Sequence, residues 1–317
     1  MVISMKNKNI VFLGTPEFAA TILEGLIAEN YNIIAVVSQP DKFVGRKRVL
    51  TYTPVKEVAL KYNIPVYQPV SLRKDYEFLK EMEIDMLITA AYGQILPTEV
   101  LNLAKINNIN VHASLLPFHR GGAPIHRAII NGDKKTGVTI MKMVEKMDAG
   151  EMYGKEEVTI DNNINTTQLF EKLQVVGKNL LLKLLPDLLN NNIKGIAQDE
   201  TKATYSFNIK REEEKIDFNK SVFQVHNLIR GLASVPGAYC LYKEKEFKIY
   251  ASEVYKVVDD NNPIGTLKIE GKDTLLVKCL DGYLKINEIK IEGKQKMDVK
   301  SFLNGCKKDE LVKEILK

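Results

Sequence analysis

The residues best suited to chemistry in this sequence of 317 residues are Asn110, His112 and Asp148. Asn110 and His112 lie two apart in a strand-like run, residues 106–112, so their side chains point to the same face of it. An amide can donate a hydrogen bond to a developing oxyanion, and an imidazole can move a proton near neutral pH. The pattern indicates a catalytic pair, and the alternative is a hydrogen-bonded pair within the core.

Asp148 lies in the sequence Met147-Asp-Ala-Gly150, in a predicted loop after the next strand, residues 138–143. A carboxylate at that place could approach His112 and orient or charge it, although a lone loop aspartate is also an ordinary turn residue. His112, His119 and His126 are spaced by seven residues, but they fall on a predicted strand end, a loop and a helix, with no cysteine or second carboxylate beside them. We therefore expect no metal site.

The elements that would position these residues alternate between strands and helices. A helix is predicted from Pro16 to about residue 29, since proline is favoured at a first helical position. The alternation predicts an α/β domain with a mainly parallel sheet, in which ligands bind at the carboxyl ends of the strands. The predicted strands are residues 10–13, 33–37, 85–90, 106–112 and 138–143, and the last of these closes the series.

Nucleotide-binding motifs are missing from the first strand–helix connection. Gly14-Thr-Pro16 is not G-x-G-x-x-G, and the chain contains no G-x-x-x-x-G-K-[ST]. A pyrophosphate site needs those glycines for close backbone approach, so a nicotinamide dehydrogenase or a P-loop enzyme is disfavoured. The segment Gly14-Thr-Pro16 is either a tight turn or a turn that lines a ligand.

The C-terminal part follows a different pattern. Apolar residues at steps of three and four over residues 169–184 predict one long helix, and a polar, charged linker follows it. A short helix is expected at 221–232, and further helices at 300–306 and 309–316. Five short runs after Pro236-Gly237 predict the strands of a small barrel, at residues 238–242, 247–257, 265–269, 275–279 and 284–291. We expect domains at residues 1–190 and 211–317, joined by a linker at 191–210.

The net charge of +5 is unevenly placed. Residues 201–317 contain 22 Lys and Arg against 18 Asp and Glu, although the general abundance of lysine could account for this excess. A long predicted loop at residues 39–48 concentrates basic residues around one Asp41, which indicates either phosphate contact or a solvated loop. The basic residues of this loop are Lys42, Arg46, Lys47 and Arg48.

The expected compartment is the cytoplasm. No run approaches the roughly 20 apolar residues that span a bilayer, and the polar start lacks the apolar region of a secretory signal. Three scattered cysteines, Cys240, Cys279 and Cys306, fit a reduced protein. We expect no membrane association.

Several motifs together give the sequence a resemblance to the methionyl-tRNA formyltransferase family over nearly its whole length. Individually several are shared by all transferases that use 10-formyltetrahydrofolate, but the ordered set with the C-terminal part is specific. The matching motifs are Phe12-Leu-Gly-Thr-Pro-Glu-Phe18, Ser38-Gln-Pro-Asp41, Ala91-Tyr-Gly-Gln-Ile-Leu-Pro97, Asn110-Val-His-Ala-Ser-Leu-Leu-Pro117, Arg120-Gly-Gly-Ala-Pro-Ile125, Asn131-Gly-Asp133, Thr136-Gly-Val-Thr-Ile-Met141 and Met147-Asp-Ala-Gly150.

The resemblance implies a Rossmann-like formyltransferase domain with a parallel-rich sheet, followed by a small OB-like β-barrel that binds tRNA. It implies transfer of the formyl group of 10-formyltetrahydrofolate to the α-amino group of initiator methionyl-tRNA, for translation initiation, by a monomer without a metal. It assigns catalysis to Asn110, His112 and Asp148, without deciding whether His112 or Asp148 is the general base, and tRNA contact to Lys42, Arg46, Lys47 and Arg48. The implied folate-binding residues are Tyr92, Gly93, Gln94, Ile95, Leu96, Pro97, Ser114, Leu115, Leu116 and Pro117.

The chain departs from the family pattern at three places. Gln94 stands where a hydrophobic residue is usual, so one wall of the pterin pocket differs. Asn208 replaces a familiar linker lysine, and Phe218 a common tryptophan.

Other functions remain as alternatives. A formyltransferase acting on an amino nucleotide-sugar would share the catalytic half, but the basic loop at residues 39–48 disfavours this alternative. Glycinamide ribonucleotide transformylase would not explain residues 210–317. A formyltetrahydrofolate hydrolase would need no amine, and a non-catalytic RNA-binding protein would leave Asn110, His112 and Asp148 without a purpose.

Overall fold

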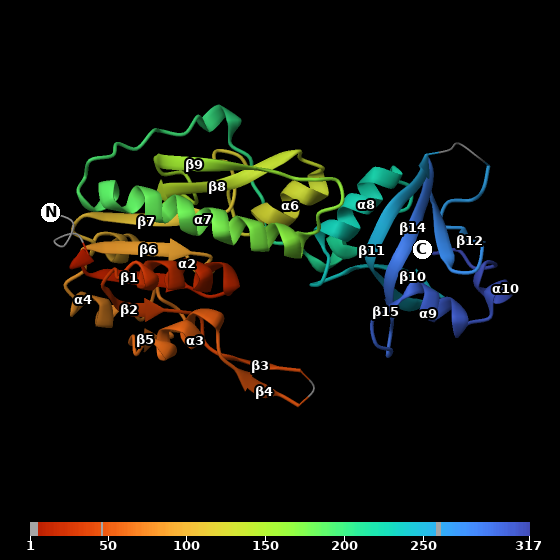
Figure 1. Ribbon diagram of the computed structural model, residues 1–317, viewed down its shortest axis with the longest axis horizontal. Helices are drawn as coiled ribbons and strands as arrows, with labels where there is room; N and C mark the ends of the chain where they lie inside the picture. Colours follow the sequence, from red (N-terminus) through yellow and green to blue (C-terminus); the bar gives the residue numbers. More distant parts are fainter. Residues whose placement is uncertain (1–5, 46, 258–260) are drawn as a thin grey trace. The chain divides into compact units, whose positions relative to one another are not determined.

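The computed structural model describes residues 6–45, 47–257 and 261–317 (Figure 1). The chain divides into two compact units. The first comprises the chain up to Pro124 together with Thr136–Thr159 and Phe170–Phe207, and the second comprises Ile125–Lys135, Ile160–Leu169 and Asn208–Lys317. Each unit is therefore assembled from three separate stretches of sequence.

The first unit is built on a seven-stranded sheet of order β5-β2-β1-β6-β7-β8-β9. The pairings among β5, β2, β1, β6 and β7 are all parallel, whereas β8 runs antiparallel to β7. This confirms the predicted α/β fold with a parallel-rich sheet. The strands are β1 (Ile10–Gly14), β2 (Ile33–Val37), β5 (Val66–Tyr67), β6 (Met86–Ala90), β7 (Asn107–His112), β8 (Lys135–Lys142) and β9 (Met152–Thr159).

The prediction that residues 138–143 close the sheet is wrong, because β9 follows them at the edge. Three consecutive charged residues of β9, Lys155 to Glu157, are exposed. Charged side chains on an edge strand block pairing with other chains, but they also remove the apolar alternation by which a strand is predicted. The strand β5 has two residues, too few to show a pattern.

Two long helices cover one face of this sheet. Helix α2 (Glu17–Ala28) contacts α7 (Thr166–Leu189) closely, since a Cβ at Gly25 would lie 2.6 Å from the Lys178 side chain. A Cβ at Gly177 of α7 would lie 3.1 Å from Val111 of β7. Val111 therefore faces α7, and strand alternation turns Asn110 and His112 to the opposite face, as predicted.

The opposite face carries a second apolar cluster. It includes Val11 and Leu13 of β1 and Leu79 of α4 (Glu77–Lys80). It also includes Val100 and Leu101 of α5 (Thr98–Leu101). Helix α3 (Pro54–Lys61) packs against α2 and is capped by Thr53, whose side-chain oxygen accepts from the Lys56 N–H.

A hairpin projects from the rest of the first unit after β2 (Figure 1). Its strands are β3 (Lys42–Val44) and β4 (Val49–Thr51), paired antiparallel from Lys42 and Thr51 to Val44 and Val49. The prediction of a loop at residues 39–48 is therefore wrong. With three exposed residues on each strand, the hairpin has no buried face to give the sequence an alternating pattern.

The second unit contains helix α6 (Pro124–Asn131), helix α8 (Val222–Gly231) and an antiparallel sheet of order β10-β11-β14-β13-β12, with β15 paired to β14. A small OB-like β-barrel is the predicted C-terminal fold, and a C-terminal domain built on an antiparallel β-sheet is confirmed. Phe218 is buried in its core, so it fills the place where tryptophan was expected. The strands are β10 (Ala238–Tyr242), β11 (Lys245–Val257), β12 (Leu267–Glu270), β13 (Thr274–Cys279), β14 (Gly282–Ile291) and β15 (Met297–Asp298).

The end of the chain is less helical than predicted. Helix α9 spans Val299–Asn304, whereas α10 spans only Lys308–Leu311, so the prediction of a helix over 309–316 is wrong. Leu316 donates its N–H to the Gly265 carbonyl, and Lys317 exchanges backbone hydrogen bonds with Leu241. Pairing with distant residues thus overrides local helix propensity.

The expected linker contains a segment that is firmly attached to the first unit. We call residues 196–206 the strap; it includes a short 3-10 turn, η1 (Glu200–Lys202). Ile196 and Met152 exchange backbone hydrogen bonds of 2.8 and 2.9 Å. Arg120 donates its N–H to the Thr204 carbonyl and accepts from the Ser206 N–H. The strap therefore pairs with two distant segments of the first unit.

Candidate active site

His112 lies at the carboxyl end of β7 and is 6% exposed. Its Nε2 lies 3.0 Å from the backbone carbonyl oxygen of His119. Because a carbonyl can only accept, Nε2 must carry a proton and donate it. Nδ1 is the ring nitrogen left for the reaction, and it lies 3.7 Å from Asp148 Oδ2, too far for a hydrogen bond but close enough for charge interaction.

Asp148 lies between β8 and β9 in the left-handed backbone region, with φ of +49°. A non-glycine residue in that conformation costs about 1–3 kcal/mol and persists where its surroundings fix it. Gly121 donates its N–H to Asp148 Oδ2 at 2.8 Å. Two residues on, a Cβ at Gly150 would lie 1.9 Å from the Lys142 carbonyl oxygen, so only glycine fits there. The loop is thereby held with the carboxylate toward His112.

Asn110 occupies the same face of β7 one pleat earlier, opposite Thr89 of β6 and Met141 of β8. It is half-buried, and within the described part of the chain its side chain makes no hydrogen bond. The buried Thr89 hydroxyl beside it has no partner among the described residues either. An uncommitted amide next to the imidazole can therefore donate to an oxygen that develops negative charge.

The residues predicted to bind folate follow the carboxyl end of β6. Tyr92 is 2% exposed, and among the described residues its hydroxyl has no hydrogen-bond partner; burial raises the pKa of Tyr92 to about 12. Thr15 Oγ1 and Gln39 Nε2 both donate to the Tyr92 carbonyl, at 3.0 and 3.2 Å. These bonds hold the Tyr92 backbone, while the ring packs in the apolar cluster and its hydroxyl remains without a partner among the described residues. Thr15 thus joins the Gly14-Thr-Pro16 turn to this loop.

The Gln94 side chain forms hydrogen bonds with the backbone of residues 69–72 in the first unit. Its Oε1 accepts from the Leu72 N–H at 2.7 Å, and its Nε2 lies 3.3 Å from the carbonyls of Pro69 and Val70. The departure from the usual hydrophobic residue is explained by these bonds. Among its neighbours, Ile95 is 76% exposed and Leu96 is buried.

The second segment predicted to bind folate, residues 114–117, is held in place by buried hydrogen bonds. Ser114 and Leu116 are fully buried, with Ser114 Oγ donating to the Phe118 carbonyl at 2.6 Å. Thr139 of β8 connects them, since its hydroxyl accepts from the Leu116 N–H and donates to the Ser114 carbonyl. Leu115 is half-buried and Pro117 buried. In this arrangement Ser114 and Leu116 shape the loop, and the Leu115 side chain lies against Gly137 of β8, where a Cβ would come within 2.6 Å of it.

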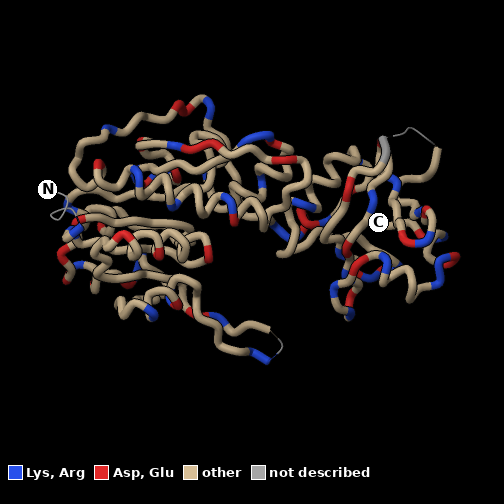
Figure 2. The backbone as a smooth tube through the Cα atoms, in the orientation of Figure 1, with Lys and Arg blue, Asp and Glu red and all other residues tan. Residues whose placement is uncertain are grey.

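The hairpin carries Lys and Arg at its base and next to its tip, where the tube is blue (Figure 2). Lys42, Lys47 and Arg48 are exposed, and the Arg48 guanidinium lies 5.4 Å from the centre of the Phe43 ring, which is itself 62% exposed. The predicted tRNA-binding residue Arg46 lies outside the described residues.

The hairpin is anchored at its base by Asp41. Burial alone would raise the pKa of Asp41, but hydrogen bonds from Lys56 and Gln68 lower it. The hairpin follows the carboxyl end of β2, and parallel strands end at the same edge of a sheet. The hairpin therefore extends from the same end of the parallel strands at which His112 lies.

The three equally spaced histidines are divided between the two units. His112 and His119 belong to the first unit and His126 to the second. His119 Nδ1 lies 2.6 Å from Ser206 Oγ of the strap. In the described ranges, no group of three or more His, Cys, Asp or Glu residues could hold a metal ion, and no helix is long and apolar enough to cross a membrane.

The geometry can be compared with known proteins. Residues 8–185 match the family model described as formyl transferase, and residues 208–307 match that of the formyl transferase C-terminal domain. Methionyl-tRNA formyltransferase of Streptococcus suis (strain 05ZYH33) is 46% identical over 95% of this chain and 96% of its own length. That of Staphylococcus aureus (strain MW2) is 44% identical over 97% of this chain and 99% of its own. The chain belongs to the methionyl-tRNA formyltransferase family.

Solved structures share the fold at lower sequence identity. The sugar 3N-formyl transferase WlaRD has a TM-score of 0.65 at 21% identity, with 91% of this chain and 99% of that chain covered. An N-formyltransferase from Helicobacter canadensis has a TM-score of 0.64 at 20% identity, with 92% and 100% covered. These structures support the fold alone, whereas the two family models and the relatives at 44 and 46% identity confirm the resemblance to the methionyl-tRNA formyltransferase family.

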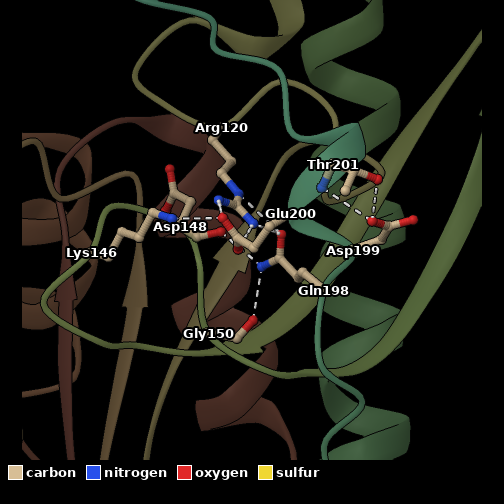
Figure 3. Close-up of polar contacts among 8 residues, drawn as sticks. All are labelled: Arg120, Lys146, Asp148, Gly150, Gln198, Asp199, Glu200 and Thr201. Carbon is tan, nitrogen blue, oxygen red and sulfur yellow. Dashed lines mark hydrogen bonds and ion pairs between the residues drawn. The ribbon is translucent and has the colours of Figure 1, made fainter.

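One group of site residues in this member of the formyltransferase family was not predicted. In the sequence Arg120 is part of the motif at residues 120–125, and no pattern marks Gln198, Glu200 or Lys146. Their side chains meet beside Asp148 (Figure 3). A single arginine in a loop otherwise made of glycine, proline and small residues was the only available signal, since the partner residues lie about 80 positions further along the chain.

Proposed function

We propose that this chain transfers the formyl group of 10-formyltetrahydrofolate to the α-amino group of methionine on initiator methionyl-tRNA, for translation initiation. The observation that carries the proposal is the near full-length similarity, at 44 to 46% identity, to relatives named methionyl-tRNA formyltransferase. The grouping of Asn110, His112 and Asp148 at the carboxyl edge of the sheet supports it, because this is where open α/β sheets bind ligands.

The folate co-substrate supplies an activated formyl group. As the amine attacks, negative charge develops on the formyl oxygen, and the free Asn110 amide is placed to donate a hydrogen bond to it. The amine must lose a proton and the folate nitrogen must gain one. His112 Nδ1, beside Asp148, is suited to move that proton.

We propose that the folate lies between the Tyr92–Pro97 and Ser114–Pro117 segments. The unpartnered Tyr92 hydroxyl and the left-handed Gly93, with φ of +87°, support a bound polar ring system there. The Helicobacter canadensis N-formyltransferase was solved in complex with folinic acid and dTDP-3-aminofucose. That complex supports a folate donor in proteins of this fold.

We propose that the side chains of Lys42, Lys47 and Arg48 in the hairpin contact phosphates of the tRNA. We also propose that residues 1–190 form the catalytic domain and that residues 211–317 form the tRNA-binding domain. Exposed cations beside an exposed aromatic ring suit a nucleic-acid backbone and an unpaired base. We further propose that the enzyme acts as a monomer in the cytoplasm, where initiator tRNA is charged.

The deciding experiment offers the purified full-length chain two acceptors, with 10-formyltetrahydrofolate as the donor. One acceptor is charged initiator methionyl-tRNA, and the other is an amino nucleotide-sugar. We expect formyl transfer to the methionyl-tRNA alone. Transfer only to the amino sugar would support the alternative function, and release of formate without either acceptor would indicate a hydrolase.

A further inference from the structure

A chain of polar contacts joins the strap to the catalytic loop through Arg120 (Figure 3). The Arg120 side chain is fully buried. Its Nε and Nη2 donate to Gln198 Oε1 at 3.1 and 2.8 Å, and its Nη1 and Nη2 donate to the two Glu200 oxygens at 3.1 and 2.7 Å. A buried guanidinium is tolerated only where its donors are satisfied, so Arg120 and these two strap side chains fix one another.

The orientation of the Gln198 side chain follows from this contact. Arginine has no acceptor, so the atom facing Arg120 must be the Gln198 oxygen. The amide nitrogen therefore faces the other way. It donates to the carbonyl oxygens of Asp148 and Gly150, both at 2.8 Å.

These two bonds act on the strained part of the loop. The left-handed Asp148 and the glycine-only position Gly150 are the residues whose carbonyls Gln198 holds. Gly121 fixes the Asp148 carboxylate itself, through the hydrogen bond to Oδ2. Gln198 thus restrains the backbone of Asp148 from the strap, about 50 residues further along the chain.

We propose that Gln198 is a positioning residue for Asp148, held in place by Arg120. It sets the backbone of Asp148 so that the carboxylate faces His112 Nδ1, and it does not touch the substrate. The proposal rests on the proposed function for its kinetic consequence, since a misplaced Asp148 would slow the proton transfer at His112 without changing the binding surfaces.

Glu200, the last residue of this series of contacts, also binds a residue of the loop that contains Asp148. Glu200 accepts hydrogen bonds from Arg120 and from Lys146, which lower the pKa of Glu200 to about 2 and keep it charged. Lys146 lies two residues before Asp148. Because Lys146 and Glu200 are both more than half exposed, their ion pair is weakly stabilising, and the constraint on the loop depends on Gln198.

The test uses the full-length chain with the variant Gln198→Glu. The new carboxylate keeps an acceptor toward Arg120, which keeps it charged, but it faces the carbonyls of Asp148 and Gly150 with an oxygen instead of a donor. Gln198→Met is the second variant, because it keeps the length of the side chain and adds no charge. Gln168→Glu is the matched control: Gln168 is exposed, and glutamate serves equally well in its helix-capping position.

We expect kcat of Gln198→Glu and Gln198→Met to fall about 10- to 100-fold, with KM for methionyl-tRNA and for the folate changed less than about threefold. Gln168→Glu should stay within about twofold of the wild type, and thermal melting should show that all three variants fold. Folded Gln198 variants with the kcat of the wild type would overturn the proposal. A rise in KM at unchanged kcat would overturn it as well, because it would place Gln198 in substrate binding.

A second readout does not depend on the substrate. The chain has four histidines, so their ring protons can be resolved by NMR in the full-length protein. In both Gln198 variants the His112 signals should shift, whereas those of His126 and His226, in the second unit, should stay as in the wild type. Unchanged His112 signals would refute the positioning role. If the wild type failed to formylate methionyl-tRNA, the proposed function would fail while this measurement still tested the role of Gln198.

Discussion

His112 Nδ1 and Asp148 Oδ2 lie 3.7 Å apart, although His112 ends β7, Asp148 lies in the loop between β8 and β9, and 36 positions separate them in the sequence. The opposite ring nitrogen of His112 is committed to the His119 carbonyl. Only one nitrogen of the ring is therefore available to exchange a proton, and it is the one that faces the carboxylate.

The first prediction concerns this pair. His112→Ala should lower kcat about 100- to 10,000-fold, because it removes the group that moves the proton. Asp148→Asn, which keeps the shape of the side chain, should lower kcat about 10- to 100-fold through loss of charge beside Nδ1. Binding of methionyl-tRNA, measured by filter retention, should remain within about twofold of the wild type. A folded His112→Ala variant with full turnover would remove His112 from the mechanism.

The second prediction concerns the hairpin. Arg48→Ala removes one exposed cation near the tip, so the slope of log Kd for tRNA against log salt concentration should decrease by about one. The KM for the folate should not change. Lys105→Ala is the control, since Lys105 is exposed and precedes β7, at the opposite edge of the sheet. An equal loss of salt dependence in both variants would mean that the hairpin has no special part in tRNA binding.

A third prediction tests the account of Gln94. Gln94→Leu restores the residue type usual in the family but leaves the buried Leu72 N–H without its acceptor. The free energy of unfolding in urea should fall by about 1–3 kcal/mol. Gln94→Glu keeps an oxygen for Leu72 and should lose less. Equal stability of Gln94→Leu and the wild type would show that these hydrogen bonds contribute nothing.

The fourth prediction concerns stability in acid. Hydrogen bonds from Arg127 and from the Lys210 N–H lower the pKa of Glu213 to about 2, from 4.5. A carboxylate whose folded pKa is depressed stabilises the fold above its unfolded pKa, and this contribution is lost as the pH falls from about 4.5 toward about 2. Because Glu213 is 36% exposed, solvent screening reduces the contribution to about 1 kcal/mol.

Urea unfolding of the wild type and Glu213→Gln should therefore differ by about 1 kcal/mol at pH 6 and converge at about pH 2 to 3. Glu310→Gln, which alters an exposed ion pair with Lys307, should show no such convergence. A difference between the wild type and Glu213→Gln that stayed constant with pH would contradict the assignment.

The residues of the sheet show what the sequence could predict. Strand β7 can be predicted because Ile109 and Val111 alternate with polar residues, and the same alternation places Asn110 and His112 on one face. The hairpin and β9 were missed because their residues are exposed or charged, so no buried face imposes a period.

The contacts of the strap lie beyond such reasoning. Gln198 and Glu200 have side chains typical of any solvated linker, and nothing local distinguishes them. Their role depends on a fold that brings them to Arg120, 78 and 80 residues away. Long-range hydrogen bonds of this kind leave no periodic trace in the sequence.

The interleaving of the two units has a consequence for synthesis on the ribosome. Residues 125–135 and 160–169 emerge early, but they belong with a core whose remaining residues begin only at Asn208. Because chains are synthesised at roughly 5–20 residues per second, these two segments leave the ribosome several seconds before the residues from Asn208 onward, against which they pack. The first unit can close once Phe207 has emerged, whereas the second must be completed around pieces already in place. Nascent chains halted before Asn208 should therefore bind chaperones through the apolar face of α6. In the completed chain this face should be buried in the second unit.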